Sequence, residues 1–329
     1  MQRFSIIVPV YGNARLFDDT LASVLRYRPS NSQVLVVHDE AYQDSYGLDG
    51  EVEFVATEHR DSLAGFLNCG LSLATGEFVA LIRPGIELDE GWDESVENAF
   101  DDDRVASVTP IITTPARPET MVAAGVAKGV GFHRKVIGLK TKIAQRTIRR
   151  VFNSKSIGPT SWAAFYRREA LNQIGTLDER LDSHFVDLDL ALSLRSLGYR
   201  NEFCPDCVVT VDRARLVTNE LTLPHGLSAQ RAAVRHPKFA STSALSSALN
   251  FISEIAASPF SPWHFRHAIQ RLGAMRLAKT DKAFADQISL QKRQNKRAQA
   301  LGLRLFESDL IEANPVDQTR TYDSARKAA

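Results

Sequence analysis

Short runs of continuous apolar residues alternate with amphipathic segments along the first part of the chain. Four runs predict strands: "FSIIVPVY", "SQVLVVHDE", "VEFVATE" and "EFVALI". Apolar residues recur at helical spacing in "ARLFDDTLASVLRY" and in "SLAGFLNCGLSLAT", which we expect Gly76 to close. Strands without alternation are typical of sheets covered on both faces, and intervening helices imply parallel strands with right-handed crossovers. Ligands bind such sheets beyond the carboxyl ends of the strands.

The alternation continues to about residue 213 and then changes. "GWDESVENAF" predicts a helix, "VASVTPII" a strand, and "TSWAAFYRREALNQIG" a strand followed by a helix. Beyond this point helical periodicity dominates, in "SALSSALNFISEIAAS" and in a longer basic amphipathic segment after the break "ASPFSPW". We therefore predict an α/β domain with a mostly parallel sheet over residues 1–213. Residues 214–329 are predicted to form a mainly helical extension with a loosely ordered tail.

Composition places the chain among ordinary globular proteins. Its 329 residues are 44% hydrophobic and 24% charged, and the net charge of +1 gives no sign of a nucleic-acid partner. Three cysteines do not make a disulfide framework, and we expect Cys204 and Cys207 to be buried thiols rather than zinc ligands. No segment approaches the roughly 18 apolar residues of a membrane span, and the N-terminal run is too short for a signal peptide. We expect a cytoplasmic protein.

Residues 128–155, "KGVGFHRKVIGLKTKIAQRTIRRVFNSK", are strongly basic and have almost no acidic balance. One interpretation is a solvated loop and helix. The other is a segment that covers a binding site and contacts phosphates or an anionic acceptor. The residues alone leave both open.

A second group of charged residues lies in "GTLDERLDSHFVDLDLALSLRSLGYRN". Asp187 and Asp189 precede a helix that Gly198 is expected to end. Carboxylates at a helix N-terminus are favoured by the macrodipole, and capping alone would explain one of them. Two of them after an acidic turn also fit a cleft in which one carboxylate acts as a base.

Four segments together resemble a family 2 glycosyltransferase of the GT-A fold: "SIIVPVYGN", "GEFVALI", "AAFYRREALNQIGTLDERL" and "VDLDLALSLRSLGYR". They occur in order from residue 4 to about residue 212. The resemblance implies a GT-A-like αβα sandwich for residues 1–213. It also implies inverting transfer of a hexosyl or related group from a nucleotide-diphosphate sugar to an acceptor hydroxyl.

The resemblance also assigns roles to individual residues. Asp187 matches the family's general base, and Asp189 is its neighbour on the acceptor side. Trp162 matches the acceptor-side loop, where an aromatic face suits a sugar ring, although a core-packing role fits almost as well. Donor-binding positions fall at the ends of the first two strands and at the end of the fourth: Pro9, Tyr11, Asn13, Asp39 and Arg83.

Three positions depart from the family pattern. His38 replaces an acidic residue, Leu67 replaces a basic one, and Arg83-Pro84-Gly85 replaces the Asp-x-Asp that holds the donor's metal. No oxygen side chain is left there for a hard cation, so the usual Mg²⁺ or Mn²⁺ is doubtful and no metal ligand is assigned. Three explanations stay open. Arg83 replaces the metal's charge, Glu87 or Asp89 reaches back to a metal, or the site lacks ordinary transfer.

The leading hypothesis is therefore a glycosyltransferase that builds glycans. Its predicted partners are a nucleotide sugar and a glycan, lipid-linked or other hydroxyl acceptor. The alternative is a non-catalytic homologue that binds nucleotide sugars or glycans and has lost the metal motif. The basic C-terminal helices permit peripheral contact with the inner face of the membrane or homo-oligomer formation.

Overall fold

A computed structural model describes most of the chain. It covers residues 2–10, 16–39, 44, 46–48, 50–58, 62–129, 132–143, 148–211, 226–239, 269–270 and 278–300. The predictions for Tyr11, Asn13 and the helix of residues 243–258 lie outside these residues.

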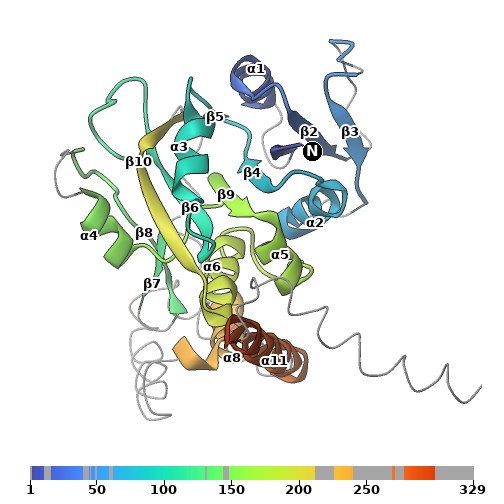
Figure 1. Cartoon of the computed structure of the whole chain (residues 1–329), viewed down its shortest axis with the longest axis vertical. Helices are drawn as coiled ribbons and strands as arrows, with labels where there is room; N and C mark the ends of the chain where they lie inside the picture. The colour runs from blue at the N-terminus through green and yellow to red at the C-terminus, as the bar shows by residue number, and fades with distance from the viewer. Residues whose placement is uncertain are drawn as a thin grey trace, which may run out of the picture.

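The centre of the molecule is an eight-stranded sheet in the order β3-β2-β1-β4-β9-β6-β10-β5 (Figure 1). β1, β2, β3, β4, β6 and β10 run in one direction, and only β9 and β5 oppose them. The predicted mostly parallel sheet is confirmed. The strands span Phe4–Pro9 (β1), Ser32–His38 (β2), Glu53–Ala56 (β3), Phe78–Ile82 (β4), Ile86–Glu87 (β5), Val105–Thr113 (β6), Ala163–Arg167 (β9) and Arg200–Val211 (β10).

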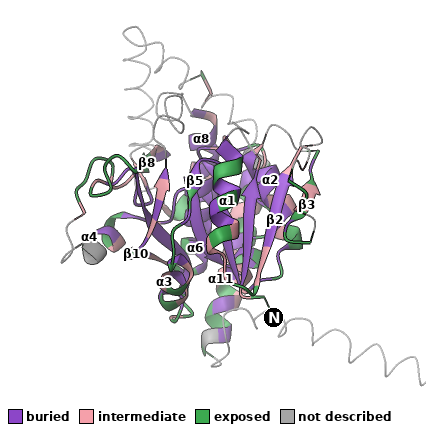
Figure 2. Ribbon diagram, turned by 90° about the horizontal axis from the view of Figure 1, so that it is seen from above, coloured by how far each residue is buried: buried purple, intermediate pink, exposed green. Residues whose placement is uncertain are grey.

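Helices cover both faces of the sheet and create two apolar cores. The first core packs α1 and α3 against alternate residues of β1, such as Phe4 and Ile6. The second packs α2, α5 and α6 against the other face, where Ile7 of β1 points. Figure 2 shows the strands mostly in the buried colour. The helices span Phe17–Tyr27 (α1), Leu63–Leu73 (α2), Trp92–Ala99 (α3), Arg168–Ile174 (α5) and Val186–Leu197 (α6).

Two glycines were expected to end helices, and only one does. Gly198 ends α6 with φ of 106°, a conformation that glycine adopts without a steric penalty. The prediction for Gly76 is wrong, because α2 ends at Leu73 and Ala74 is its C-cap. A Cβ at Gly76 would lie 2.5 Å from the backbone of Phe4 and Ser5, so this glycine permits close approach to β1.

The basic segment of residues 128–155 forms a ribbon and a helix beside the sheet. β7 (Val126–Lys128) and β8 (Arg134–Val136) pair antiparallel in a separate two-stranded sheet. The helix α4 (Ile148–Lys155) follows and contacts β10.

In β10 the register shifts between Cys204 and Val208, and both Cys204 and Cys207 are buried free thiols, as predicted.

The C-terminal part contributes α8 (Gly226–Arg235), the short 3-10 helix η3 (Pro237–Phe239) and α11 (Ala278–Ala300). α11 contacts both α8 and α6 (Figure 1). Ile288 of α11 joins the second core. The described part of the extension is therefore helical and packs on the α/β domain. No helix among the described residues is both long and apolar enough to cross a membrane.

Candidate active site

The end of β4, where Arg83-Pro84-Gly85 replaces the family's metal motif, is a tight turn. Ile86 N–H donates to the carbonyl of Arg83 at 3.1 Å, and Gly85 has φ of 93°. Proline at the second position and a positive-φ glycine at the third are typical of a type II turn. Gly85 N–H also donates to Thr20 Oγ1 at 2.8 Å, which fixes the turn to the first turn of α1. The replaced motif thus redirects the chain from β4 into β5.

A short segment before β9 connects this turn to the start of α6. Arg83 N–H donates to the carbonyl of Trp162 at 2.9 Å. The neighbouring Ser161 N–H donates to Asp187 Oδ2, also at 2.9 Å. The adjacent residues Ser161 and Trp162 therefore connect Asp187 to Arg83. This brings three predicted site residues, Arg83, Trp162 and Asp187, together. Trp162 is itself buried in the first core, which accords with the packing interpretation of its ring.

Asp187 lies in the first turn of α6 and is held by an arginine of the basic segment. Arg134 Nε donates to Asp187 Oδ1 at 2.8 Å, and Arg134 Nη2 donates to Oδ2 at 2.6 Å. The side chains are 6% and 0% exposed, so the pair is shielded from water. Parallel bonds of this kind are among the stronger protein hydrogen bonds. The basic segment therefore reaches Asp187, while its predicted contact with phosphates or an anionic acceptor stays a prediction.

The negative charge of Asp187 also affects the pKa of the neighbouring Tyr166. Burial raises the pKa of Tyr166 well above its ordinary value, and the negative charge of Asp187 raises it further. Tyr166 belongs to β9, directly after the segment that binds Asp187. The carboxylate is therefore enclosed by β9, α6 and the β7–β8 ribbon.

The ribbon is attached to α6 by an apolar contact as well. Phe132, in the connection between β7 and β8, is buried with Phe185, Leu188 and Leu192. Its φ of 63° is a left-handed conformation that non-glycine residues adopt only at a cost. Lys128 Nζ lies 4.9 Å from the centre of the Phe132 ring. Tertiary packing thus holds a strained backbone beside Arg134.

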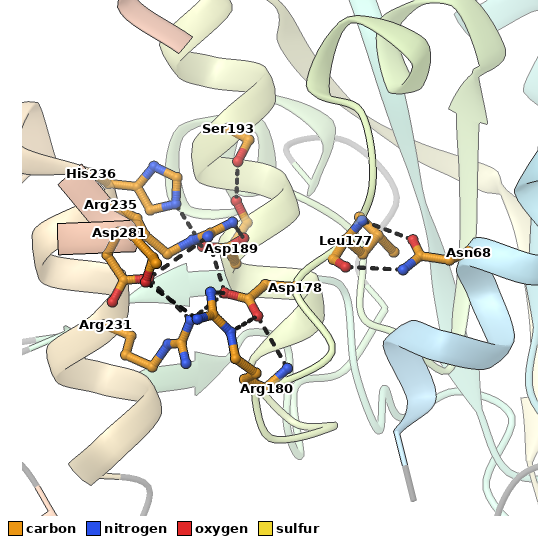
Figure 3. A network of polar contacts seen from close by, with 11 residues as sticks. Asn68, Leu177, Asp178, Arg180, Asp189, Ser193, Arg231, Arg235, His236 and Asp281 are labelled. Atoms are coloured by element: carbon orange, nitrogen blue, oxygen red, sulfur yellow. Dashed lines mark hydrogen bonds and ion pairs between the residues drawn. The ribbon is translucent and has the colours of Figure 1, made fainter. Parts of the chain in front are cut away.

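Asp189, two residues after Asp187, lies in a different environment. Arg235 donates to both of its carboxylate oxygens at 2.9 Å, and His236 Nε2 lies 2.8 Å from Oδ1 (Figure 3). Burial on its own raises the pKa of Asp189, but Arg235 and His236 outweigh it and hold the pKa below its ordinary value. Neither Asp187 nor Asp189 caps α6, because Phe185 is the N-cap and no side chain makes a capping hydrogen bond there. The capping interpretation is wrong.

The contacts of Asp189 belong to a larger ionic cluster that joins α6 to the C-terminal helices. Asp178 accepts hydrogen bonds from Arg231, from Arg235 Nη1 and from Arg180 Nε. Arg231 Nη2 also donates to Asp281 Oδ1 at 3.0 Å (Figure 3). The guanidinium of Arg235 stacks 3.6 Å from the centre of the Phe284 ring. These contacts place Asp189 at an interface with α8, and its predicted acceptor-side role stays a prediction.

Asn68 of α2 fixes the loop that precedes this cluster. Its Nδ2 donates to the carbonyl of Leu177 at 2.9 Å, and Leu177 N–H donates back to Asn68 Oδ1 at 2.7 Å (Figure 3). Asn68 Nδ2 also lies 3.2 Å from Glu179 Oε1. The side chain of Asn68 therefore forms hydrogen bonds with both the N–H and the carbonyl of Leu177 in the turn "GTLDE".

The other donor-side predictions fall at neighbouring strand ends. Pro9 is the last residue of β1 and pairs with Val37 of β2. Asp39 directly follows β2, and His38 ends that strand. Parallel strands bring these ends to one edge of the sheet. The donor-binding roles of Pro9, Tyr11, Asn13, Asp39 and Arg83 stay predictions.

The residues at the end of β4 do not fit a divalent cation. Arg83 is cationic, Pro84 has no donor atom in its side chain, and Gly85 has no side chain. Glu87 and Asp89 are exposed, and they line a separate hollow of about 1030 Å³ with α1 and residues 114–117. In the part of the chain that the structure describes, no three His, Cys, Asp or Glu side chains form a group suited to a metal.

Sequence reasoning missed several residues around the predicted base. Arg134 was only one of many cations in a basic segment, and Ser161 acts through its backbone. Arg235 and His236 belong to the extension, which the predicted boundary at residue 213 separates from the α/β domain. The imbalance of positive charge in residues 128–155 was the one available signal, since a buried carboxylate requires a counter-ion.

The sequence matches the model of a known protein family. The family described as Glycosyl transferase family 2 matches residues 5–175, which is more than half of the 329 residues. The chain therefore belongs to glycosyltransferase family 2. No curated protein matches the sequence.

Solved structures agree on the fold. The crystal structure of GalNAc-T7 with UDP, GalNAc and Mn²⁺ matches with a TM-score of 0.53 at 14% identity, covering 72% of this chain and 48% of that one. TarS of S. aureus matches with a TM-score of 0.50 at 14% identity, covering 75% of this chain and 41% of that one. At such identities the likeness shows the GT-A fold alone. The chain spans less than half the length of either protein.

Proposed function

We propose that this protein transfers a sugar from a nucleotide-diphosphate donor to an acceptor hydroxyl, with Asp187 as the general base. The observation that carries the proposal is the position of Asp187 relative to the end of β4. Asp187 is linked through Ser161 and Trp162 to Arg83 at the strand end where GT-A enzymes hold the donor. A base and a donor-side cation thus belong to one connected unit.

In the proposed reaction the acceptor hydroxyl gives its proton to Asp187 as its oxygen bonds to the anomeric carbon. The bond from that carbon to the diphosphate oxygen breaks, and the nucleoside diphosphate leaves with the electron pair. Attack from the opposite face inverts the anomeric configuration. The charge that develops on the leaving diphosphate needs stabilisation, and a guanidinium provides two parallel donors for it.

We assign that role to Arg83, the residue in place of the metal motif. Its backbone is fixed at the end of β4 by the type II turn and by the bond to Trp162. Because the backbone is fixed, the Cα of Arg83 has a defined position, and this limits where the guanidinium can lie. The side chains at this strand end do not fit a metal ion, so the proposed reaction depends on the guanidinium of Arg83 instead. GalNAc-T7 was crystallised with Mn²⁺, which makes metal dependence a property to measure here.

The non-catalytic alternative is less well supported. Membership of a glycosyltransferase family favours an enzyme. The sugar, the base of the nucleotide and the acceptor stay open; a glycan, a lipid-linked sugar and another hydroxyl compound are all acceptors to test.

The experiment is transfer from UDP-, GDP- and dTDP-sugars to a panel of glycan and lipid-linked acceptors, with EDTA or with Mn²⁺. Turnover in EDTA that disappears in Arg83→Ala and in Asp187→Asn supports the proposal. Donor binding without turnover on any acceptor supports the non-catalytic alternative. Turnover only with Mn²⁺ excludes the assigned role of Arg83.

We also propose that the protein acts in the cytoplasm at a membrane surface and uses α11 for contact. A groove of about 420 Å³ is lined by Lys238, Ser289, Lys292, Arg293 and Lys296. Burial lowers the pKa of Lys292, and the charges of Lys238 and Lys296 lower it further. Leu290 on the same helix is 55% exposed. Anionic lipids attract such a surface by about 1 kcal/mol per basic residue.

Sedimentation with phosphatidylglycerol vesicles tests this contact, with phosphatidylcholine vesicles as the uncharged comparison. We expect binding to the anionic vesicles only, and its loss when Lys292, Arg293 and Lys296 are changed to glutamine. Lys282→Gln, at an exposed position on the same helix, is the matched control. Equal binding to both vesicles, or self-association that the triple variant abolishes, contradicts a membrane role and favours a homo-oligomer.

A further inference from the structure

The carboxylate of Asp187 has no free side in the observed arrangement. Oδ1 accepts from Arg134 Nε, and Oδ2 accepts from both Arg134 Nη2 and Ser161 N–H, at distances between 2.6 and 2.9 Å. The side chain is 0% exposed. An acceptor hydroxyl cannot reach within hydrogen-bond distance of a carboxylate that is enclosed in this way. In the observed arrangement Asp187 is therefore not accessible to an acceptor hydroxyl.

Freeing the carboxylate requires that Arg134 leave it. Separating a buried ion pair is unfavourable because it leaves two charges without compensation. The separation becomes accessible when another anion receives the guanidinium. A diphosphate is well suited, since it carries more charge than a carboxylate and accepts the same parallel pair of donors. The proposed donor brings such a group to the site.

The element that carries Arg134 is built differently from the rest of the fold. Arg134 begins β8 in a ribbon of only two strands, outside the main sheet. The ribbon bears the strained backbone of Phe132, with φ of 63°, inserted beside Phe185 and Leu188. Strained residues of this kind persist only where packing imposes them, and they occur often in switch segments.

We infer that Asp187 and the diphosphate of the donor compete for Arg134, so that donor binding releases the base. This inference rests on the proposed function and deepens it, because it names a second guanidinium for the diphosphate and an order of binding. In the free protein Arg134 neutralises Asp187. In the donor complex Arg134 faces the diphosphate, and Asp187 keeps the Ser161 bond and is open to the acceptor.

Competition for one arginine has a thermodynamic signature that a purely structural ion pair lacks. Removing the competitor, in Asp187→Asn, lets the diphosphate bind Arg134 without breaking the ion pair between Arg134 and Asp187. Asp187→Asn should therefore bind a nucleoside diphosphate more tightly than the wild type does. Arg134→Gln should bind it more weakly, and the double variant should lose the gain from Asp187→Asn. Coupling between two sites is typically about 5- to 150-fold in affinity, so we expect a change of at least about fivefold.

Isothermal titration with UDP, GDP and dTDP measures these affinities on the full chain. Asp189→Asn is the matched control, because it removes the carboxylate of another buried two-bond Asp–Arg pair on the same helix. It should not tighten nucleotide binding. Thermal unfolding of each variant identifies any that fails to fold, and Arg134→Lys provides a second, more conservative replacement. It keeps the charge but loses the parallel bonds, so its affinity should fall between those of the wild type and Arg134→Gln.

The outcomes separate this inference from the proposed function. Tighter binding by Asp187→Asn that disappears in the double variant supports the competition, whether or not an acceptor has been found. Equal affinity of wild type, Asp187→Asn and Arg134→Gln overturns it, and so does a gain that persists without Arg134. In both of those results transfer activity can still be present. Absence of nucleotide binding in every folded variant overturns the inference and the proposed function together.

Discussion

Arg134 and Asp187 are 53 residues apart in the sequence and share two hydrogen bonds of 2.8 and 2.6 Å. One lies on a ribbon outside the main sheet and the other in the first turn of α6. The pair joins the basic segment to the residue predicted to act as the general base. Its burial gives it consequences for stability that are separate from any role in transfer.

We expect Arg134→Met to destabilise the protein by about 3–5 kcal/mol, because it leaves the carboxylate of Asp187 buried without a counter-ion. Arg134→Met combined with Asp187→Leu should be less destabilised than Arg134→Met alone, since no buried charge then remains. Urea unfolding at neutral pH measures both free energies. A double variant that is as unstable as the sum of the single variants would contradict the pairing.

The turn at the end of β4 gives a second prediction. Gly85→Ala places a side chain at φ of 93°, and its Cβ would lie 3.2 Å from Leu16 Cδ1. We expect a loss of about 1–2 kcal/mol of stability and weaker donor binding, because the turn fixes the backbone of Arg83. Gly91→Ala, also at positive φ but with no neighbouring atom within 4 Å, is the control. It should lose stability and keep donor affinity; equal effects on affinity would exclude a specific role for the turn.

Asn68 supports a third prediction, on the loop "GTLDE". Asn68→Ala removes the partners of both backbone groups of Leu177, and an unsatisfied buried polar group costs about 1–3 kcal/mol. Hydrogen exchange of the Leu177 amide should become faster than in the wild type, while exchange in β1 stays slow. Asn68→Asp keeps the acceptor for Leu177 N–H and should protect that amide better than alanine does. Unchanged exchange in Asn68→Ala would show that the loop does not depend on Asn68.

The ionic cluster at α8 gives a prediction about pH. The folded-state pKa of Asp189 is depressed, so its contribution to stability is present above the ordinary carboxyl pKa of about 4 and is lost as the pH falls through the folded value. We expect Asp189→Asn to be destabilised by several kcal/mol at pH 7, where a buried pair is broken. The difference from the wild type should shrink below about pH 4. Unfolding at a series of pH values measures it, and a constant difference would contradict the assignment.

Much of the α/β fold follows from the sequence because its strands are buried on both faces. The continuous apolar run around Ile6 and Ile7 predicts β1 without further information, and both core clusters use it. The position of β9 between β4 and β6 is not predictable in this way. Its antiparallel pairing joins segments far apart in the chain, and its own pattern does not specify a direction.

The candidate site was predictable only in part, for a related physical reason. Asp187 belongs to a local motif, so its position on α6 follows from the sequence. Arg134 is one of several similar cations, and only the tertiary fold selects it as the partner. The Pro84-Gly85 pair was a turn signal in its own right, and reading it only as a lost metal motif hid its structural role. The ionic cluster of Asp189 depends on α8, which a division at residue 213 assigns to another domain.

The most direct test of the account is the rate of nucleoside diphosphate release from a sugar donor in EDTA, in the presence of an acceptor. We predict steady release by the wild type, unchanged on addition of Mn²⁺. Asp187→Asn should be slower by about 10²- to 10⁴-fold, the usual contribution of a general base, while it still binds the nucleotide. Release that requires Mn²⁺, or that is as fast in Asp187→Asn as in the wild type, would contradict the account.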